Sequence, residues 1–164
     1  DYEGNGTGGL PYGFLKSEGT EIQGAVGNGW KIIGFDESNH LQVGEFSDTS
    51  GLRDAVEFHP ALIINGQNLV AGTGLNDQQP RTAIGQAKDG TVLMLVIDGR
   101  QFHSFGISIE RCGEIMGKYG AYQASMLDGG SSSVMVDKGR EITSPTTLSQ
   151  NEEGRTLPDA FLVR

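Results

Sequence analysis

The first half of the chain is a series of short apolar runs separated by polar and glycine-rich segments. The runs 30–35 and 40–46 are joined by a polar Asp-Glu-Ser-Asn segment, and this arrangement predicts a hairpin. The run 61–64 predicts a strand that ends in an Asn-Gly turn. We interpret residues 48–57 as a short helix. Because turn residues recur between these runs, we expect mainly short elements and tight turns here.

The middle of the chain predicts a strand, a helix and a second strand. Residues 91–98 are apolar almost throughout, as expected of a strand that is buried on both faces. Apolar residues three and four positions apart mark one face of a helix through 108–119, with Ser108 as its N-cap. The run 121–127 is the next strand. Because a crossover helix of this length makes the two strands parallel, their carboxyl ends should lie at one edge of the sheet.

Further strands are predicted on both sides of this unit. The run 81–87 is joined to 91–98 by an Asp-Gly turn, which is a strong hairpin signal. We also interpret residues 133–136 and the final run 160–164 as strands. A long polar loop is expected between them, over residues 143–156.

Composition and charge narrow the function classes. The 164 residues suit one domain with a buried core, and the net charge of −9 argues against binding to nucleic acid or to anionic membrane surfaces. The apolar runs are too short to span a bilayer. The lone cysteine, Cys112, forms no internal disulfide and is expected in the core. The chain begins at Asp1 without a signal peptide, and we interpret it as a fragment of a longer protein.

Two aspartates follow the predicted parallel strands. Asp98 and Asp128 each end a strand, and a glycine follows each of them. In open α/β sheets this edge is where binding sites form, so the two carboxylates are expected to converge. The alternative for Asp98 is a turn residue that accepts backbone hydrogen bonds.

Glycines and arginines are the candidates for holding an anion. Gly129 and Gly130 follow a strand, where backbone amides can point at an anion; the alternative is a flexible turn. Arg81 and Arg155, each by itself more typical of a solvated side chain, suit bidentate capture of phosphate oxygens. His59 is interpreted as a structural residue.

Four motifs, in this order, resemble the phosphodiester glycosidase family. They are FHPALIINGQ, QPRTAIGQAKDGTVLMLVIDGR, GAYQASMLDGGSSSVMV and GRTLPDAFLVR, and the resemblance covers residues 8–164. It implies an α+β fold with mixed, twisted β-sheets around the strand-helix-strand crossover. It also implies a single phosphodiester glycosidase domain over 1–164 and an extracytoplasmic location. The family usually carries an Asn-Gly-Gly/Ser-Phe segment upstream of the point that matches LPYG, so we expect the N-terminal segment of the domain to be missing.

The resemblance also implies an activity and roles for individual residues. Such an enzyme hydrolyses the sugar C1–O bond of a sugar-1-phosphodiester in a glycan or cell-envelope polymer. Asp98 and Asp128 match the family's strand-end aspartates, and we assign the carboxylate roles to them. The residues that match its substrate- and phosphate-binding positions are Arg81, Arg100, Gly129, Gly130, Ser131, Ser132 and Arg155.

The chemistry fits these residue types, but three questions stay open. A departing phosphate monoester is weakly basic, so arginines can stabilise its charge without a general acid, while a carboxylate assists at C1. The alternatives are cleavage at phosphorus and a non-catalytic glycan-binding or envelope-assembly module. Paired aspartates also suit Ca²⁺ or Mg²⁺, and the sequence leaves a metal role undecided.

Overall fold

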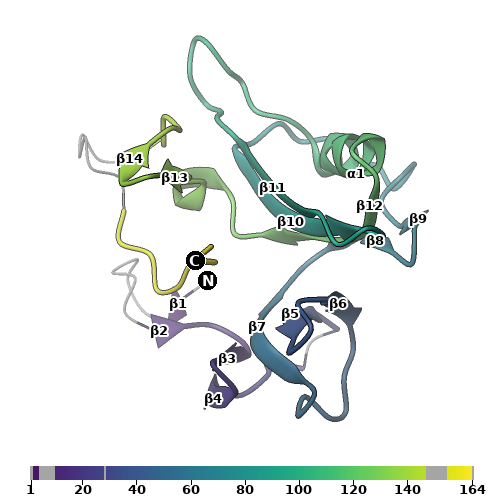
Figure 1. Cartoon of the computed structure of the whole chain (residues 1–164). Helices are drawn as coiled ribbons and strands as arrows, with labels where there is room; N and C mark the ends of the chain where they lie inside the picture. The colour runs from purple at the N-terminus through teal and green to yellow at the C-terminus, as the bar shows by residue number, and fades with distance from the viewer. Residues whose placement is uncertain (1, 4–9, 28, 147–154, 164) are drawn as a thin grey trace.

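Two five-stranded antiparallel sheets and one α-helix dominate the residues that the computed structural model describes, which are 2–3, 10–27, 29–146 and 155–163 (Figure 1). The first sheet has the order β4 (Thr20–Gln23), β3 (Leu15–Ser17), β7 (Leu52–Phe58), β5 (Lys31–Asp36) and β6 (Leu41–Gly44). The second has the order β11 (Val92–Ile97), β10 (Arg81–Ala87), β12 (Ala121–Leu127), β8 (Ala61–Ile64) and β9 (Gln67–Asn68). The helix is α1 (Ile109–Lys118), and the short elements are β1 (Tyr2–Glu3), β2 (Leu10–Pro11), η1 (Gly130–Ser132), β13 (Val136–Asp137) and β14 (Arg140–Glu141).

The second sheet is the middle layer, with α1 on one face and the first sheet on the other (Figure 1). Alternation along β10 shows how the layers form, because neighbouring residues of a strand point to opposite faces. Ala83 packs in the core cluster under α1, and the next residue, Ile84, packs in the cluster between the sheets.

The prediction that 91–98 is buried on both faces is therefore wrong. β11 is the edge strand of its sheet, and Val92 and Met94 are exposed. The strand that is covered on both faces is its neighbour β10. Apolar composition alone does not distinguish the two strands, because coverage depends on their places in the sheet.

β11 and β12 run in the same direction without pairing to each other. Each pairs antiparallel with β10, which lies between them. Arg81 pairs with Ile97 of β11, and Thr82 pairs with Leu127 of β12. The start of β10 therefore lies between the ends of β11 and β12, where Asp98 and Asp128 follow. Both aspartates therefore lie at one end of the sheet, where a site can form.

Several local predictions are confirmed. β5 and β6 form the expected hairpin, and β8 ends at the 65–66 turn, where both residues have positive φ angles of 52° and 80°. The side chain of Ser108 caps the helix by accepting a hydrogen bond from Arg111 N at 3.1 Å. Cys112 and Met116 are buried on the helix face that meets the sheet.

Three other predictions are wrong. Residues 48–57 do not form a helix, because Leu52–Phe58 is the strand β7, which pairs with β5 along its length. Residues 133–136 do not form a strand, since η1 precedes them and β13 begins only at Val136. The described part of the final segment, 155–163, contains no strand; Phe161 instead packs on Phe35 with ring centroids 6.1 Å apart.

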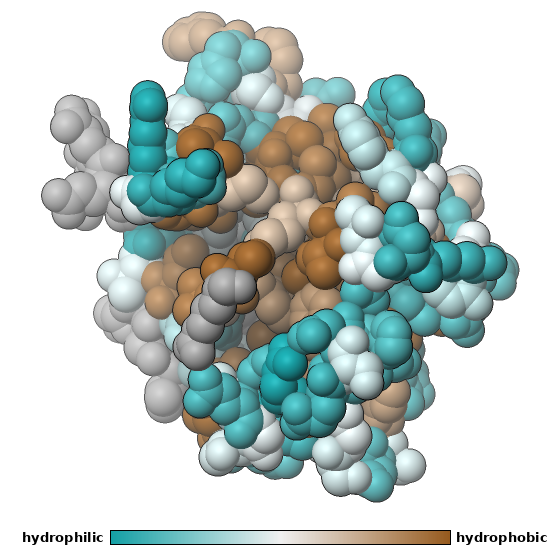
Figure 2. All heavy atoms as spheres, in the orientation of Figure 1, coloured by the Kyte–Doolittle hydropathy of each residue, from teal (hydrophilic) through white to brown (hydrophobic). Residues whose placement is uncertain are grey.

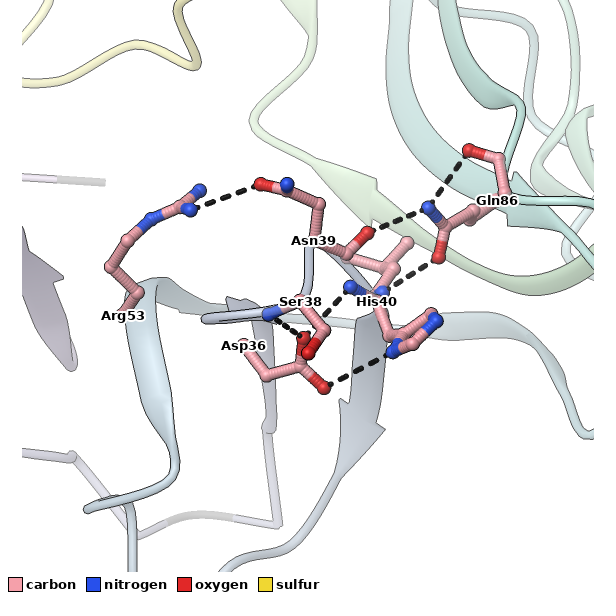
Figure 3. A network of polar contacts seen from close by, with 8 residues as sticks. Asp36, Ser38, Asn39, His40, Arg53 and Gln86 are labelled. Atoms are coloured by element: carbon pink, nitrogen blue, oxygen red, sulfur yellow. Dashed lines mark hydrogen bonds and ion pairs between the residues drawn. The ribbon is translucent and has the colours of Figure 1, made fainter.

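A buried glutamine joins the two sheets (Figure 3). The Nε2 group of Gln86, on β10, donates to the carbonyl oxygens of Asn39 at 2.8 Å and Gly90 at 3.0 Å. Its Oε1 accepts from Leu41 N at 2.7 Å. A buried side-chain amide is costly unless it is hydrogen-bonded, and here both ends are satisfied. These bonds hold the β5–β6 hairpin against the second sheet.

The turn of the same hairpin is held by Asp36 (Figure 3). Its Oδ1 accepts from Ser38 N at 2.8 Å and from His40 N at 2.9 Å. The hydrogen bond from the His40 backbone is the largest cause that lowers the pKa of Asp36, because it stabilises the ionised carboxylate. This turn lies near Gln86, at the opposite end of β10 from Arg81.

Cys112→Ala is expected to lower the free energy of unfolding by on the order of 1 kcal/mol, through loss of apolar contacts. Burial raises the pKa of the Cys112 thiol from 9.0 to about 11. The stability that comes from burying the neutral thiol is therefore present below pH 9.0 and declines as the pH rises toward about 11. Labelling of the native protein by a thiol reagent should be slow; a rate equal to that of the denatured protein would contradict this burial.

Candidate functional site

Glycines allow three chain segments to meet at the start of β10. Pro80 precedes β10 and is fully buried. A Cβ atom at Gly99, after β11, would lie 2.7 Å from Pro80 N, and one at Gly129, after β12, would lie 2.8 Å from Pro80 O. Side chains at these positions would force the strand ends apart. The glycines after Asp98 and Asp128 are thus explained by close packing around Pro80.

A pocket of about 450 Å³ opens at this end of the second sheet, within the usual size range of small-ligand sites. Its polar lining includes Arg81, Arg100, Asp128 and the backbone of Gly129 and Gly130. The end of β7 and the connection to β8 supply a less polar part of the lining, which contains Phe58, His59 and Pro60. Figure 2 shows hydrophobic residues gathered in the middle of the displayed face, between the two sheets, with hydrophilic residues around them.

Arg81 is fixed by contacts with the loops that precede β10 and α1. Its Nε donates to Ile107 O at 3.1 Å, and its Nη2 donates to Asp77 O at 2.8 Å. Nη2 also lies 3.0 Å from a carboxylate oxygen of Asp77, and only 11% of the Arg81 side chain is exposed. The guanidinium is therefore held in one orientation at the pocket, which reduces the entropy that binding an anion would cost.

Arg100 reaches the same pocket from the loop after β11. Its backbone has a φ of 56°, and its Nε donates to Oε1 of Gln79 at 2.7 Å. The guanidinium lies beside Gly130, where a Cβ atom would be 3.5 Å from both Nη1 and Nη2. Two arginines thus line one pocket, an arrangement that suits the oxygens of a phosphate group.

Asp128 is the carboxylate that the structure places at this pocket. Ser132 Oγ donates to its Oδ2 at 2.7 Å, across the turn that η1 forms. Asp159 lies close enough to Asp128 for the two carboxyl groups to interact electrostatically. Partial burial of its carboxyl group raises the pKa of Asp159, and the negative charge of Asp128 raises the pKa further, but the residue as a whole is exposed, so water screens both effects. The titration of Asp159 is thus coupled to the charge of Asp128.

The structure places Asp98 in a different environment. Its Oδ1 accepts from Ser144 N at 3.0 Å, and its carbonyl oxygen accepts from Ser104 Oγ at 2.6 Å. It is not among the residues that line the pocket. These contacts match the alternative of a turn aspartate, and they hold the 99–107 loop and the segment at Ser144 together. The two aspartates follow strands that end at the same edge, but only Asp128 reaches the pocket.

The expected anion nest is only partly supported. Gly130 N donates to Pro80 O at 3.0 Å, and Ser132 N donates to Gly129 O at 3.0 Å. Both amides are therefore used inside the protein, Gly130 N by the carbonyl that precedes β10 and Ser132 N by the turn at η1. Of the other predicted positions, Ser131, Ser132 and Arg155 are outside the pocket lining, and Arg155 is partly buried in the final segment. Their binding roles remain predictions.

Three residues of the region were not predicted as site residues. His59 was interpreted as structural, but it is exposed and lines the pocket. Gln79 positions Arg100 and also lines the pocket. Asp159 approaches Asp128 from the other end of the chain. Single polar residues in loops carry no periodic signal, so only the fold reveals that they belong together.

The predictions about a metal role and about a membrane span can be compared with the described residues alone. Among the residues that the structure describes, no three His, Cys, Asp or Glu side chains gather as a metal site requires, so the proposed Ca²⁺ or Mg²⁺ role gains no support. No helix in the described ranges is long and apolar enough to cross a membrane.

A sequence model of the phosphodiester glycosidase family matches residues 1–164. The chain belongs to the phosphodiester glycosidase family. The match confirms the family resemblance of the four ordered motifs. The phosphodiester glycosidase chain also has a curated relative from Bacillus subtilis (strain 168), "SPbeta prophage-derived uncharacterized protein YomE", which is 39% identical over 70 residues. That match covers 43% of this chain and 11% of the relative.

Solved structures show the same fold. The zebrafish N-acetylglucosamine-1-phosphodiester alpha-N-acetylglucosaminidase catalytic domain, auto-inhibited by its pro-peptide, is similar with a TM-score of 0.75 at 19% identity. The similarity covers 92% of this phosphodiester glycosidase chain and 59% of the zebrafish chain. A hypothetical protein from Synechocystis has a TM-score of 0.57 at 13% identity, over 81% of this chain and 45% of that one. At these identities the structures support the mainly β architecture with one helix.

Proposed function

We propose that this chain belongs to a hydrolase that cleaves the sugar C1–O bond of a sugar-1-phosphodiester. The observation that carries the proposal is the convergence of Arg81, Arg100 and Asp128 on one pocket. Family membership supports a glycosidase-type function. The name of the zebrafish relative describes cleavage at a sugar-1-phosphodiester, and we extend that substrate class to this chain as part of the proposal.

The arginines fit the leaving group of such a reaction. Breaking the C1–O bond releases a phosphate monoester, whose negative charge is already stable in water, so it requires little protonation as it departs. Arg81 and Arg100 would bind its oxygens and stabilise the charge that develops on the bridging oxygen. The contacts of Arg81 with Ile107 and Asp77 orient its guanidinium before the substrate arrives. Because the net charge of the protein is −9, most of its surface repels an anion, and the two arginines would make this pocket a local exception.

Asp128 is the best candidate for the carboxylate that acts at C1. It lines the arginine pocket, whereas Asp98 does not. As an anion it would stabilise the positive charge that grows at C1, act as the nucleophile, or accept a proton from the attacking water. Asp159, whose charge interacts with that of Asp128, would hold the attacking water by hydrogen bonding. We further propose an extracytoplasmic location, which the family resemblance supports.

A comparison of two substrates tests the proposal. A sugar-1-phosphodiester should be hydrolysed at least about 10²-fold faster than the matching alkyl glycoside, because the neutral glycoside offers the arginines no anion. Release of free sugar plus a phosphomonoester identifies cleavage at C1. Release of sugar phosphate plus an alcohol would show cleavage at phosphorus, and binding without turnover would indicate a glycan-binding module. Arg81→Lys keeps the charge and loses the fork, so it should slow the diester and leave the slow alkyl glycoside rate unchanged.

A further inference from the structure

β11 is the one long, uncharged strand among the four edge strands of the two large sheets. β9 has only two residues, and β4 carries Glu21. β6 has four residues and buries its apolar side chains, Leu41 and Val43. β11, in contrast, has six residues that are all apolar. Natural edge strands are usually short, charged or covered, so the edge at β11 lacks the ordinary protection against pairing with another strand.

The free backbone groups of β11 belong to Val92, Met94 and Val96. Ala87 N donates to Thr91 O at 2.9 Å, so the Thr91 carbonyl points toward β10. In an antiparallel strand the backbone groups of successive residues point alternately to the two sides, and those at 92, 94 and 96 therefore point away from β10. No strand among the described residues pairs with that side, which is the margin of the second sheet in Figure 1. A row of unpaired N–H and carbonyl groups thus remains available.

The side chains of β11 are apolar on both faces of this edge. Leu93 and Leu95 pack against the core cluster under α1 and are only partly buried. Val92 and Met94 point to the other face, where they are 42% and 43% exposed. An added strand with apolar residues on both faces would cover these side chains and bond to the free backbone groups at the same time.

A second copy of β11 meets this requirement in an antiparallel register centred on Met94. A two-fold axis through the strand centre places Met94 opposite Met94 of the second copy, and Val92 opposite Val96. The three residues that point outward in one copy then face the same three in the other, and each opposed pair exchanges two N–H···O bonds. On the other face Leu93 lies opposite Leu95. Every cross-strand pair is therefore apolar, as in stable sheets.

Charge favours this edge over the rest of the surface for contact between two copies. Because each chain has a net charge of −9, two copies repel each other over most of their surface. β11 has no charged residue. Lys88 and Asp89 precede it, and Asp98 and Arg100 follow it, so each end of the strand carries one charge of either sign. The antiparallel register brings these two ends together without net repulsion.

We propose that β11 is a homodimer interface at which two copies join their five-stranded second sheets edge to edge. A ladder of six residues is about 20 Å long, which is small for a permanent interface, so the dimer should be reversible. The opposite edge of the sheet, β9, has only two residues, so assembly should stop at two copies. No residue of β11 lines the arginine pocket, and the interface is therefore separate from the candidate site.

Met94→Lys and Met94→Glu test both the interface and its register. Each variant places two like charges opposite each other at the two-fold axis, so each alone should raise the dissociation constant of the dimer by about 10²-fold or more. An equimolar mixture of the two variants should restore the dimer, because opposite charges then face each other. Sedimentation velocity over a micromolar concentration series measures both effects. Ile22→Lys is the matched control, since Ile22 is an apolar residue, 60% exposed, on the edge strand β4, and it should leave the constant unchanged.

Amide hydrogen exchange identifies what covers the edge. The amides of Val92, Met94 and Val96 should be protected in concentrated samples and lose that protection on dilution, whereas those of Leu93 and Leu95, which point toward β10, should stay protected throughout. Thermal unfolding of the Met94 variants, together with recovery of the dimer in their mixture, shows that they fold. A monomer at every concentration, open-ended larger species, or a dimer that survives Met94→Lys would overturn the inference. Protection of the three outward amides in a monomer would also overturn it, because another segment of the chain would then cover β11.

Discussion

Asp128→Asn is expected to reduce turnover of a sugar-1-phosphodiester by about 10²-fold or more while the protein stays folded. Asparagine keeps the size of the side chain, and its Oδ1 can still accept the hydrogen bond from Ser132 Oγ. Only the negative charge is lost from the arginine pocket. The variant should retain binding to the phosphomonoester product, or gain affinity for it, because an anion next to the site has been removed. Single-turnover kinetics and a product-binding titration measure the two effects.

The same substitution should change the titration of Asp159. The charge of Asp128 is one of the causes that raise the Asp159 pKa, after burial. In Asp128→Asn the Asp159 pKa should therefore fall toward its ordinary value, with the contribution of burial remaining. Carboxyl-carbon NMR over an acidic pH series follows this directly. An unchanged Asp159 titration would show that the two carboxylates are not coupled.

Asp98→Asn is the matched control for Asp128→Asn. Its oxygen can keep the bond from Ser144 N, and the residue does not line the pocket. We expect turnover to fall by less than about tenfold, in contrast to the loss of a charge that touches the reacting centre. A loss at Asp98 as large as the loss at Asp128 would restore the sequence-based assignment of both aspartates to the catalytic centre.

Glu57→Ala is expected to lower the free energy of unfolding by about 3 kcal/mol or more. The side chain is 5% exposed, and its removal leaves the backbone N–H groups of Phe14, Val26 and Gly27 without their acceptor. Hydrogen bonds to a charged group contribute more than neutral ones, and a buried donor without an acceptor is costly. Denaturant unfolding measures the change in free energy, with the slope checked for a common denatured state.

Two controls separate this effect from a general loss of charge. Glu57→Gln keeps one side-chain oxygen as an acceptor and should lose less stability than Glu57→Ala. Glu45→Ala removes an exposed glutamate that pairs with Lys31 at the surface, and it should change stability far less than Glu57→Ala does. Equal losses in Glu57→Ala and Glu45→Ala would contradict the anchoring role of Glu57.

Local patterns in the sequence determined the elements whose partners are close along the chain. The helix at 109–118 could be predicted because its apolar spacing, the Ser108 cap and the strand that follows are all local signals. The β5–β6 and β10–β11 hairpins were found for the same reason. Where the environment is set by distant partners, the predictions failed. β7 became a strand through pairing with β5, and β11 became an exposed edge strand although its composition suggested burial.

The candidate site likewise combines residues that local motifs indicate with an arrangement that depends on distant partners. Arg81, Arg100 and Asp128 stand beside predicted strand ends in motifs that resemble those of the family, so the sequence could mark them as candidate site residues. Their convergence depends on β10 lying between β11 and β12, and on glycines small enough to pack around Pro80.

Only the tertiary structure separated Asp98 from the pocket and brought other residues to it. Asp98 follows its strand as Asp128 does, yet its carboxylate is used by Ser144 N. His59 meets Trp30 because Lys31 pairs with Phe58 across the first sheet. Asp159 approaches Asp128 from the final segment of the chain. The sequence determined which chemical groups are available, whereas long-range strand pairing and close backbone packing decided which of them share a pocket, because such contacts leave no periodic signal along the chain.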